Sequence, residues 1–182
     1  MLVPAKRIIP LIVLLACFVA CNRAARRQQQ MKAFASDANM LIKQANEVTK
    51  QWVDEFVKTF TAENRNKFPA NRDFLRTHAE KIIKLLDESC RLNNTAADKY
   101  EQAAKLVGTD EERKGLLSFA SAFRKTVEAN ELIKAQMRMV FDETLVDGKI
   151  FNDRMTHSWE QVRQKQDESQ QQIQEGRRLL HW

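Results

Sequence analysis

Apolar residues recur at alternating steps of three and four along most of the chain, and this rhythm constrains the fold more than any other feature. Such spacing places a stripe along one face of a helix. The chain also holds only 4 Gly and 3 Pro in 182 residues, too few for the many turns of an all-β fold. The sequence therefore predicts an all-α protein.

Four segments carry the pattern, with short breaks between them. They span about residues 24–62, 72–107, 110–146 and 149–180. Short connections favour antiparallel neighbours, and the three-four spacing favours near-parallel, left-handed packing of the coiled-coil type. We therefore expect a long antiparallel four-helix bundle in up-down-up-down order. A helical hairpin array that dimerises to complete its core is the alternative.

The second segment has the most regular stripe. Its predicted inward positions are Leu75, Ala79, Ile82, Leu86, Ser89, Asn93, Ala96, Tyr100, Ala103 and Val107.

Local signals predict where the helices begin and end. Asn71 is a candidate N-cap for the second helix, and Gly108 predicts a left-handed C-cap at its end. Thr109 with Glu112 has the pattern of a capping box for the third helix. Thr95, within the second segment, predicts a kink or a restart.

Polar residues interrupt the predicted seams at several inward positions. Gln166 and Ser169 take the apolar slots of the fourth segment, and Ser89, Asn93 and Asn130 lie in other seams. A buried polar group needs a hydrogen-bond partner. That partner could be a ligand, a water molecule or a second chain.

The N-terminus has the pattern of a targeting segment. Lys6 and Arg7 precede an uncharged apolar run over residues 8–20, as in a signal peptide. The run is shorter than the roughly 20 residues that a membrane-spanning helix needs. Small residues precede Cys17 and Cys21. The segment thus resembles a bacterial lipoprotein signal, in which an aliphatic residue, a small residue and a Cys mark cleavage and lipidation.

The resemblance implies cleavage before Cys21, with Cys17 as the second choice, and attachment of lipid such as palmitate to that thiol. It also implies a location in the bacterial cell envelope, anchored to the inner or outer membrane and facing the periplasm. Residues 1–20 would then be the signal peptide, 21–30 a basic tether and 31–182 the bundle domain. An uncleaved signal anchor, an organelle transit peptide and ordinary secretion are the alternatives.

Basic charge is concentrated near the N-terminus. Six of the 30 basic residues lie in the first 36 positions, which hold no acid, so residues 37–182 carry 24 bases and 24 acids. A neutral body argues against nucleic-acid binding.

An up-down-up-down bundle would bring both chain ends to the same end of the molecule. Basic residues there, with a terminal Trp, suit a membrane surface. The predicted membrane contacts are Arg23, Arg26, Arg27, Arg177, Arg178 and Trp182.

The sequence contains no recognisable catalytic, cofactor or metal motif. The Glu-x-x-His pattern of di-iron bundles fails at both His78 and His157. The glycines form no phosphate-binding loop, and Cys90 lies at helical spacing from apolar residues, which predicts a buried, inert thiol. We therefore expect no catalysis, cofactor or metal.

Two function classes fit these features. The first is a non-catalytic envelope lipoprotein that acts as an interaction or scaffold module, with a protein partner in the envelope or a second copy of the chain. The second is a periplasmic small-ligand-binding or sensor-type helical bundle, which the polar seam residues favour.

Overall fold

The computed structural model describes the backbone of residues 8–181 and the side chains of residues 23–181. All regular secondary structure in this part of the chain is helical, which confirms the all-α prediction. The helices are α1 (Ile8–Thr59), α2 (Ala62–Asn66), α3 (Arg72–Ala104), α4 (Asp110–Arg138), the 3₁₀ helix η2 (Met139–Phe141) and α5 (Gly148–Leu180).

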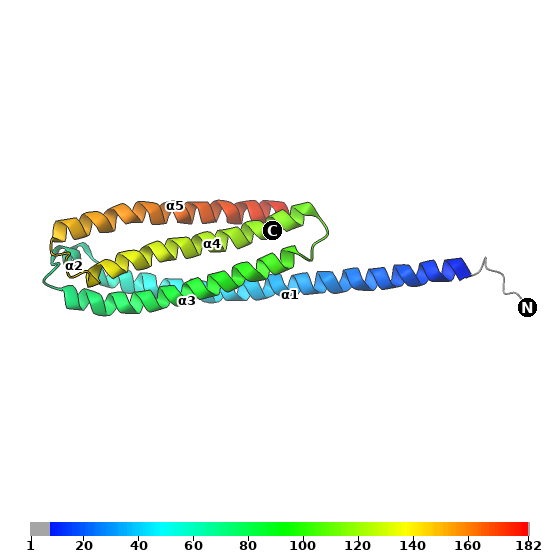
Figure 1. Ribbon diagram of the computed structural model, residues 1–182, viewed down its shortest axis with the longest axis horizontal. Coiled ribbons are helices and arrows are strands. Elements are labelled where there is room, and N and C mark those ends of the chain that lie inside the picture. Colours follow the sequence, from blue (N-terminus) through cyan, green and yellow to red (C-terminus); the bar gives the residue numbers. More distant parts are fainter. Residues whose placement is uncertain (1–7, 182) are drawn as a thin grey trace, which may run out of the picture.

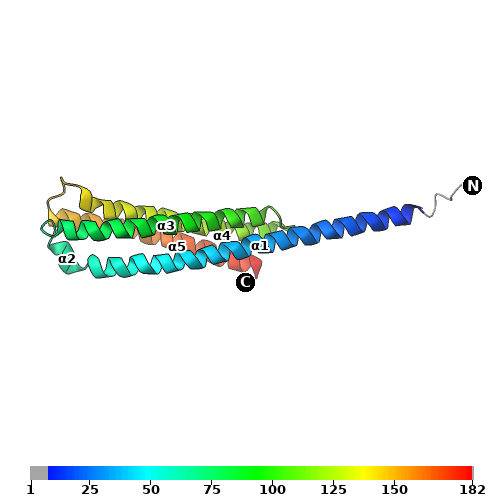
Figure 2. The ribbon, with the colours of Figure 1, turned by 90° about the horizontal axis from the view of Figure 1, so that it is seen from below.

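The four long helices lie side by side in one elongated body, and successive long helices run in opposite directions (Figures 1 and 2). α1 packs along α3, α3 along α4, and α4 along α5. The remaining side of the body, between α1 and α5, has little close backbone contact. α1 continues beyond the body next to the α3–α4 turn and the C-terminal end of α5 (Figure 1). We call this the exit end.

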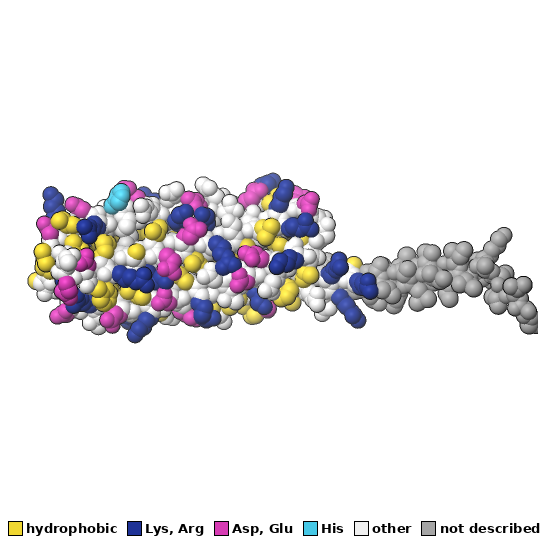
Figure 3. Space-filling view, in the orientation of Figure 1, with side chains coloured by type: hydrophobic (Ala, Val, Ile, Leu, Met, Phe, Trp, Pro, Cys, Tyr) yellow, Lys and Arg dark blue, Asp and Glu magenta, His cyan; other side chains and the backbone are white. Residues whose placement is uncertain are grey.

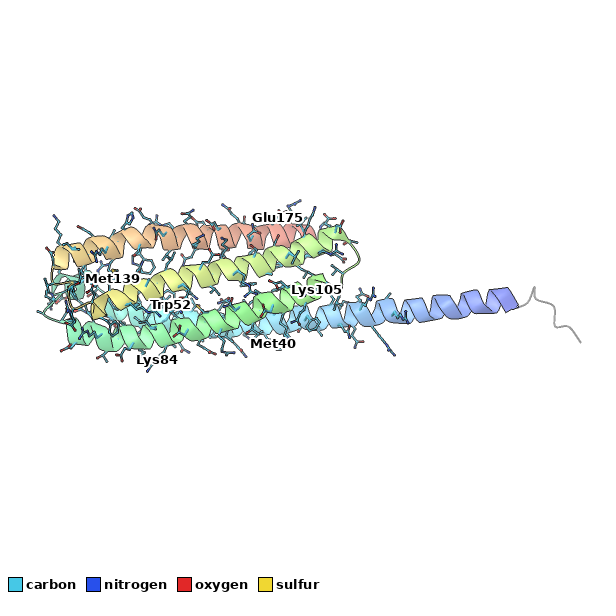
Figure 4. The ribbon with its side chains drawn as sticks, viewed as in Figure 1. Met40, Trp52, Lys84, Lys105, Met139 and Glu175 are labelled. Atoms are coloured by element: carbon cyan, nitrogen blue, oxygen red, sulfur yellow. The ribbon has the colours of Figure 1, made fainter. Side chains whose placement is uncertain are left out.

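The core consists of two apolar clusters. The α2-end cluster holds large side chains, among them Trp52, Phe68 and Phe151. The exit-end cluster combines alanines of α1 and α3 with aromatic side chains such as Tyr100 and Phe119. In Figure 4, Trp52 lies inside the body while Lys84 projects from the outer face of α3.

The predicted stripe of α3 is confirmed. Every predicted inward position is buried except Val107, which is half-buried. The predicted kink at Thr95 is wrong, since α3 is one continuous helix across this residue. The Thr95 hydroxyl donates a hydrogen bond to the Arg91 carbonyl at 2.8 Å. The hydroxyl is thus bonded to the preceding turn of the same helix and does not cap a new helix.

The predicted helix ends are right in part. Thr109 caps α4 by accepting a hydrogen bond from the Glu112 amide at 3.2 Å. Asn71 holds the N-cap position of α3, but its side chain donates to the Asn64 carbonyl instead of capping. The left-handed cap at Gly108 is wrong, because α3 ends at Ala104 with a right-handed residue after it and no described Gly has positive φ.

The segment boundaries differ from expectation in several places, and α1 begins at Ile8 instead of about residue 24. The break after α1 contains the short helix α2, which Thr61 caps by accepting from the Asn64 amide. The third helix ends at Arg138, earlier than the predicted 146, and continues as the 3₁₀ helix η2. The later apolar positions Val140 and Leu145 are still buried, because the chain folds across the end of the body.

Candidate binding groove

A groove runs along the side of the body between α1 and α5. Its middle section has a volume of about 630 Å³, and its section at the exit end has a volume of about 570 Å³. Asn39 lines both sections. Toward α2, Phe56 of α1 meets Trp159 of α5 edge to face, with ring centroids 5.2 Å apart. This pair bridges α1 and α5 beyond the middle section. We call the whole feature the α1/α5 groove.

Two glycines hold α5 close to α4. A Cβ on Gly176 would lie 3.0 Å from the Gly115 carbonyl oxygen and 3.0 Å from the Phe119 ring. A Cβ on Gly115 would lie only 2.7 Å from Leu180 Cγ. The absence of side chains at both positions lets α5 lie directly on α4.

Alanines perform the same role between α1 and α3. The alanines of α1 and α3 that are buried in the exit-end cluster are Ala35, Ala38, Ala96, Ala97, Ala103 and Ala104. Close packing within each pair draws α1 toward α3 and α5 toward α4. The side between α1 and α5 is therefore left open.

Three stacked aromatic rings form the floor of the middle section. The Tyr100 ring lies 5.2 Å from the Phe119 ring and 5.9 Å from the Phe123 ring, measured between centroids. The Tyr100 hydroxyl donates a hydrogen bond of 2.8 Å to Asn39 Oδ1 on the α1 wall. Burial raises the pKa of Tyr100 to about 12, because the phenolate would lose its hydration.

Carboxamide side chains dominate the walls of the middle section. Asn39 and Asn46 stand on α1, and Gln166 and Gln170 stand on α5. All four residues are exposed. These side chains carry no charge, so the walls are polar without a strong electric field.

The prediction that Gln166 faces the core is wrong, whereas Ser169 is buried as predicted. The hydroxyls of Ser169 and Thr126 are hydrogen-bonded at 3.1 Å, which joins α5 to α4. Gln166 and Ser169 differ in burial because α5 packs on α4 and has little contact with α1. In a closed bundle the Gln166 side of α5 would face α1, but here that side opens onto the groove.

A polar layer lies at the inner edge of the groove and separates the two apolar clusters. Ser89 Oγ accepts hydrogen bonds from Asn130 Nδ2 at 3.1 Å and from Asn93 Nδ2 at 3.3 Å, and Thr49 Oγ1 lies 3.4 Å away. The prediction of buried polar seam residues is thus confirmed for Ser89, Asn93 and Asn130. They satisfy one another across α1, α3 and α4.

The predicted membrane contacts that the structure describes all lie at the exit end. Arg23, Arg26 and Arg27 are exposed where α1 leaves the body, and Arg177 and Arg178 are exposed in the last turn of α5. Figure 3 shows Lys and Arg side chains at this neck. The same section of the groove is lined by Gln28, Met31 and Lys32 of α1 and by residues 179–181, which brings the two ends together.

Three of the predicted site residues lie outside the described part of the structure. Trp182 is not described, and neither are the side chains of Cys17 and Cys21. The backbone of α1 passes through both cysteines and through the expected domain boundaries at residues 20 and 30 without a break.

His78 and Cys90 have ordinary structural surroundings. His78 pairs with Glu55 of α1, whose pKa is lowered by hydrogen bonds from Lys81 and then His78. Cys90 is a buried free thiol, and burial raises its pKa to about 11, which confirms the prediction of a buried thiol. Among the residues described, no three His, Cys, Asp or Glu side chains group in a way that could hold a metal ion.

Comparison with known proteins gives no family assignment. No family model, curated protein or solved structure matches this chain. A search of the described residues finds no helix that is both long and apolar enough to span a bilayer. Function must therefore be inferred from the residues of this chain.

The groove walls were not predicted from the sequence, although a signal for them exists. Asn39 and Asn46 are seven residues apart and share one face of α1 beside its apolar stripe. Gln166, Gln170 and Ile173 follow steps of four and three on α5. Uncharged polar residues that repeat beside an apolar stripe, on two helices, are the pattern to look for.

Proposed function

We propose that this protein is a non-catalytic lipoprotein of the bacterial cell envelope that acts as an interaction module. Lipid on Cys21 anchors it to a membrane, and residues 31–182 form an antiparallel up-down-up-down bundle that faces the periplasm. The α1/α5 groove is the surface through which the bundle binds its partner. A protein of the envelope and a second copy of the chain are both candidates for that partner.

The observation that carries this proposal is the path of α1. One unbroken helix of 52 residues contains Cys21 and also forms a wall of the groove. Ala24 and Arg27 already lie beside the α3–α4 turn at Gly108. Ala24 is three residues from Cys21, or about 5 Å along a helix. An anchor at Cys21 therefore holds the exit end of the bundle against the lipid headgroups.

Charge at the exit end supports this orientation. Arg23, Arg26 and Arg27 are exposed and precede the first acid of the chain, Asp37. Anionic lipids attract a basic side chain near the surface by about 1 kcal/mol.

The last turn of α5 completes a basic collar together with these arginines. It contributes Arg177 and Arg178, and we expect Trp182, two residues beyond the end of α5 in the sequence, to join them. Arg178 is paired with Glu175 at 2.7 Å. Exposed pairs of this kind contribute only about 0–1 kcal/mol, so the pair does not prevent a lipid contact.

The anchor is tested by metabolic labelling with an alkyne analogue of palmitate in cells that express the full chain. We expect label on the wild-type protein and on Cys17→Ser, and loss of both label and membrane association for Cys21→Ser. If Cys17→Ser lost the label and Cys21→Ser kept it, the lipid would be attached to Cys17 instead. An unlabelled wild-type protein would contradict the lipoprotein proposal.

A second candidate is a periplasmic small-ligand-binding or sensor-type bundle. The groove volume favours it, since each section falls in the range of about 300–1,000 Å³ that is usual for ligand pockets. A thermal-shift screen of small metabolites tests it. Stabilisation that Gln170→Ala abolishes would favour this candidate over a macromolecular partner.

A further inference from the structure

We propose that the middle section of the α1/α5 groove binds an uncharged oligosaccharide chain. This proposal rests on the interaction function above and adds to it, because it assigns the middle section of the groove to a sugar chain and leaves the rest of the groove to the protein partner.

The walls match the hydrogen-bonding pattern of sugar hydroxyls. A carboxamide donates through its NH₂ group and accepts through its oxygen, and a sugar hydroxyl likewise does both. Asn46 on α1 and Gln170 on α5 offer such groups from opposite walls. Asn39 accepts the Tyr100 hydroxyl through Oδ1, which fixes the orientation of its amide and leaves Nδ2 as a donor toward the groove.

The floor of the middle section suits the faces of a sugar ring, which present C–H groups. Ile42 of α1 and Ile173 of α5 are half-buried against the exit-end cluster, and Phe123 also lines the section. An apolar floor between polar walls fits a ligand that is apolar on its ring faces and polar around its edges. The groove is also open along its length, so a chain can lie in it without being threaded through a closed cavity.

The charges of the section argue against other elongated ligands. Arg177 and Asp167 are the charged residues among those described as lining it, so a phosphate-rich or carboxylate-rich polymer would meet one cation and one anion. A fatty acyl chain would cover the wall carboxamides without hydrogen-bonding to them, which is unfavourable for each group.

The length of the section argues against a docked helix. Asn39 and Thr49 mark its extent along α1, a distance of about 15 Å. A helix seated in this length would make fewer than three turns of contact, and helices shorter than about 12–15 residues are marginal in water. A short stretch of a sugar chain needs no such folding.

The test is isothermal titration of the full-length protein in polyoxyethylene detergent micelles, which contain no sugar. Chitotetraose and maltohexaose are the probes, one with acetamido groups and one without. We expect at least one of them to bind, and Asn46→Ala and Gln170→Ala each to weaken that binding at least tenfold. Gln102→Ala is the matched control, since this amide is exposed on α3 and does not line the groove. It should change binding less than twofold.

Three results would overturn the proposal. The first is the absence of binding to both probes and to a panel of uncharged oligosaccharides. The second is binding that the wall variants do not affect. The third is groove-dependent binding of uncharged peptides instead of sugars. The palmitate labelling above does not depend on any of these results, so the anchor and the sugar site can fail separately.

Discussion

Gly176 of α5 packs directly against the backbone of Gly115 of α4. A Cβ at position 176 would come within 3.0 Å of the Gly115 carbonyl oxygen. This contact fixes α5 on α4 and so keeps α5 away from α1. These two residues without side chains, together with the alanines between α1 and α3, leave the side between α1 and α5 open.

Gly176→Ala should destabilise the protein by up to about 2 kcal/mol. Overpacking costs about 1–3 kcal/mol, and better helix propensity offsets about 1 kcal/mol of it. The neighbours cannot easily yield, because one is backbone and the other, Phe119, is stacked on Tyr100. Chemical denaturation measures the change in the free energy of unfolding.

Gly108→Ala is the control for this substitution. Nothing lies within 4 Å of a Cβ at Gly108, and its φ is not positive. We expect unchanged or slightly higher stability, since Ala restricts the unfolded chain. Equal destabilisation by both alanines would show that the α4–α5 contact is not tight.

Ser89→Ala should cost about 1–3 kcal/mol, because it removes the acceptor shared by Asn130 and Asn93 and leaves buried amides with fewer partners. A double-mutant cycle with Asn130→Ala isolates this coupling. The double variant should be more stable than the sum of the two single effects predicts. Strict additivity would mean that the polar layer does not act as one network.

Phe123→Ala should destabilise the protein by about 3 kcal/mol, as expected when a buried aromatic side chain is lost. Phe123 is 8% exposed and stacks on Tyr100. Leu117→Ala, on the same helix but 43% exposed, should stay within about 0.5 kcal/mol. Similar changes in the free energy of unfolding for the two variants would contradict the buried position of Phe123 on α4.

The tyrosine absorbance near 295 nm should titrate with a pKa of about 12 in the folded protein. Tyr100 is the single tyrosine of the chain, so the signal has one source, and burial is the cause of the raised pKa.

The same shift has a consequence for stability. In the unfolded chain Tyr100 ionises near pH 10, while the folded protein keeps its proton until about pH 12. Between these values the folded state binds more protons, so the stability contributed by the neutral phenol is lost as pH rises. Tyr100→Phe should remove this part of the decline, and a decline of equal size in Tyr100→Phe would contradict it.

The helical architecture could be predicted from the sequence because it depends on periodicity. The stripe from Leu75 to Ala103 identifies a buried face without knowledge of its neighbours. The cap at Thr109 was predictable for the same reason, since capping depends on residues three positions apart.

The groove could not be predicted because it depends on distances between helices. Nothing in the periodicity of α5 says that Gly176 meets Gly115, sixty-one positions earlier in the chain. That contact decides whether Gln166 faces a closed core or an open groove. Gln166 was therefore assigned to the wrong face, whereas Ser169, three residues further on, was assigned correctly.

Photo-crosslinking in intact cells tests most directly whether the α1/α5 groove is the interaction surface. A diazirine amino acid would replace Gln170 on the groove wall and, as the control, Gln102 on α3. Both positions are exposed, so they differ in location and not in access to solvent. We predict a specific adduct from position 170 and none from position 102. An adduct from position 102 with none from position 170 would contradict the account.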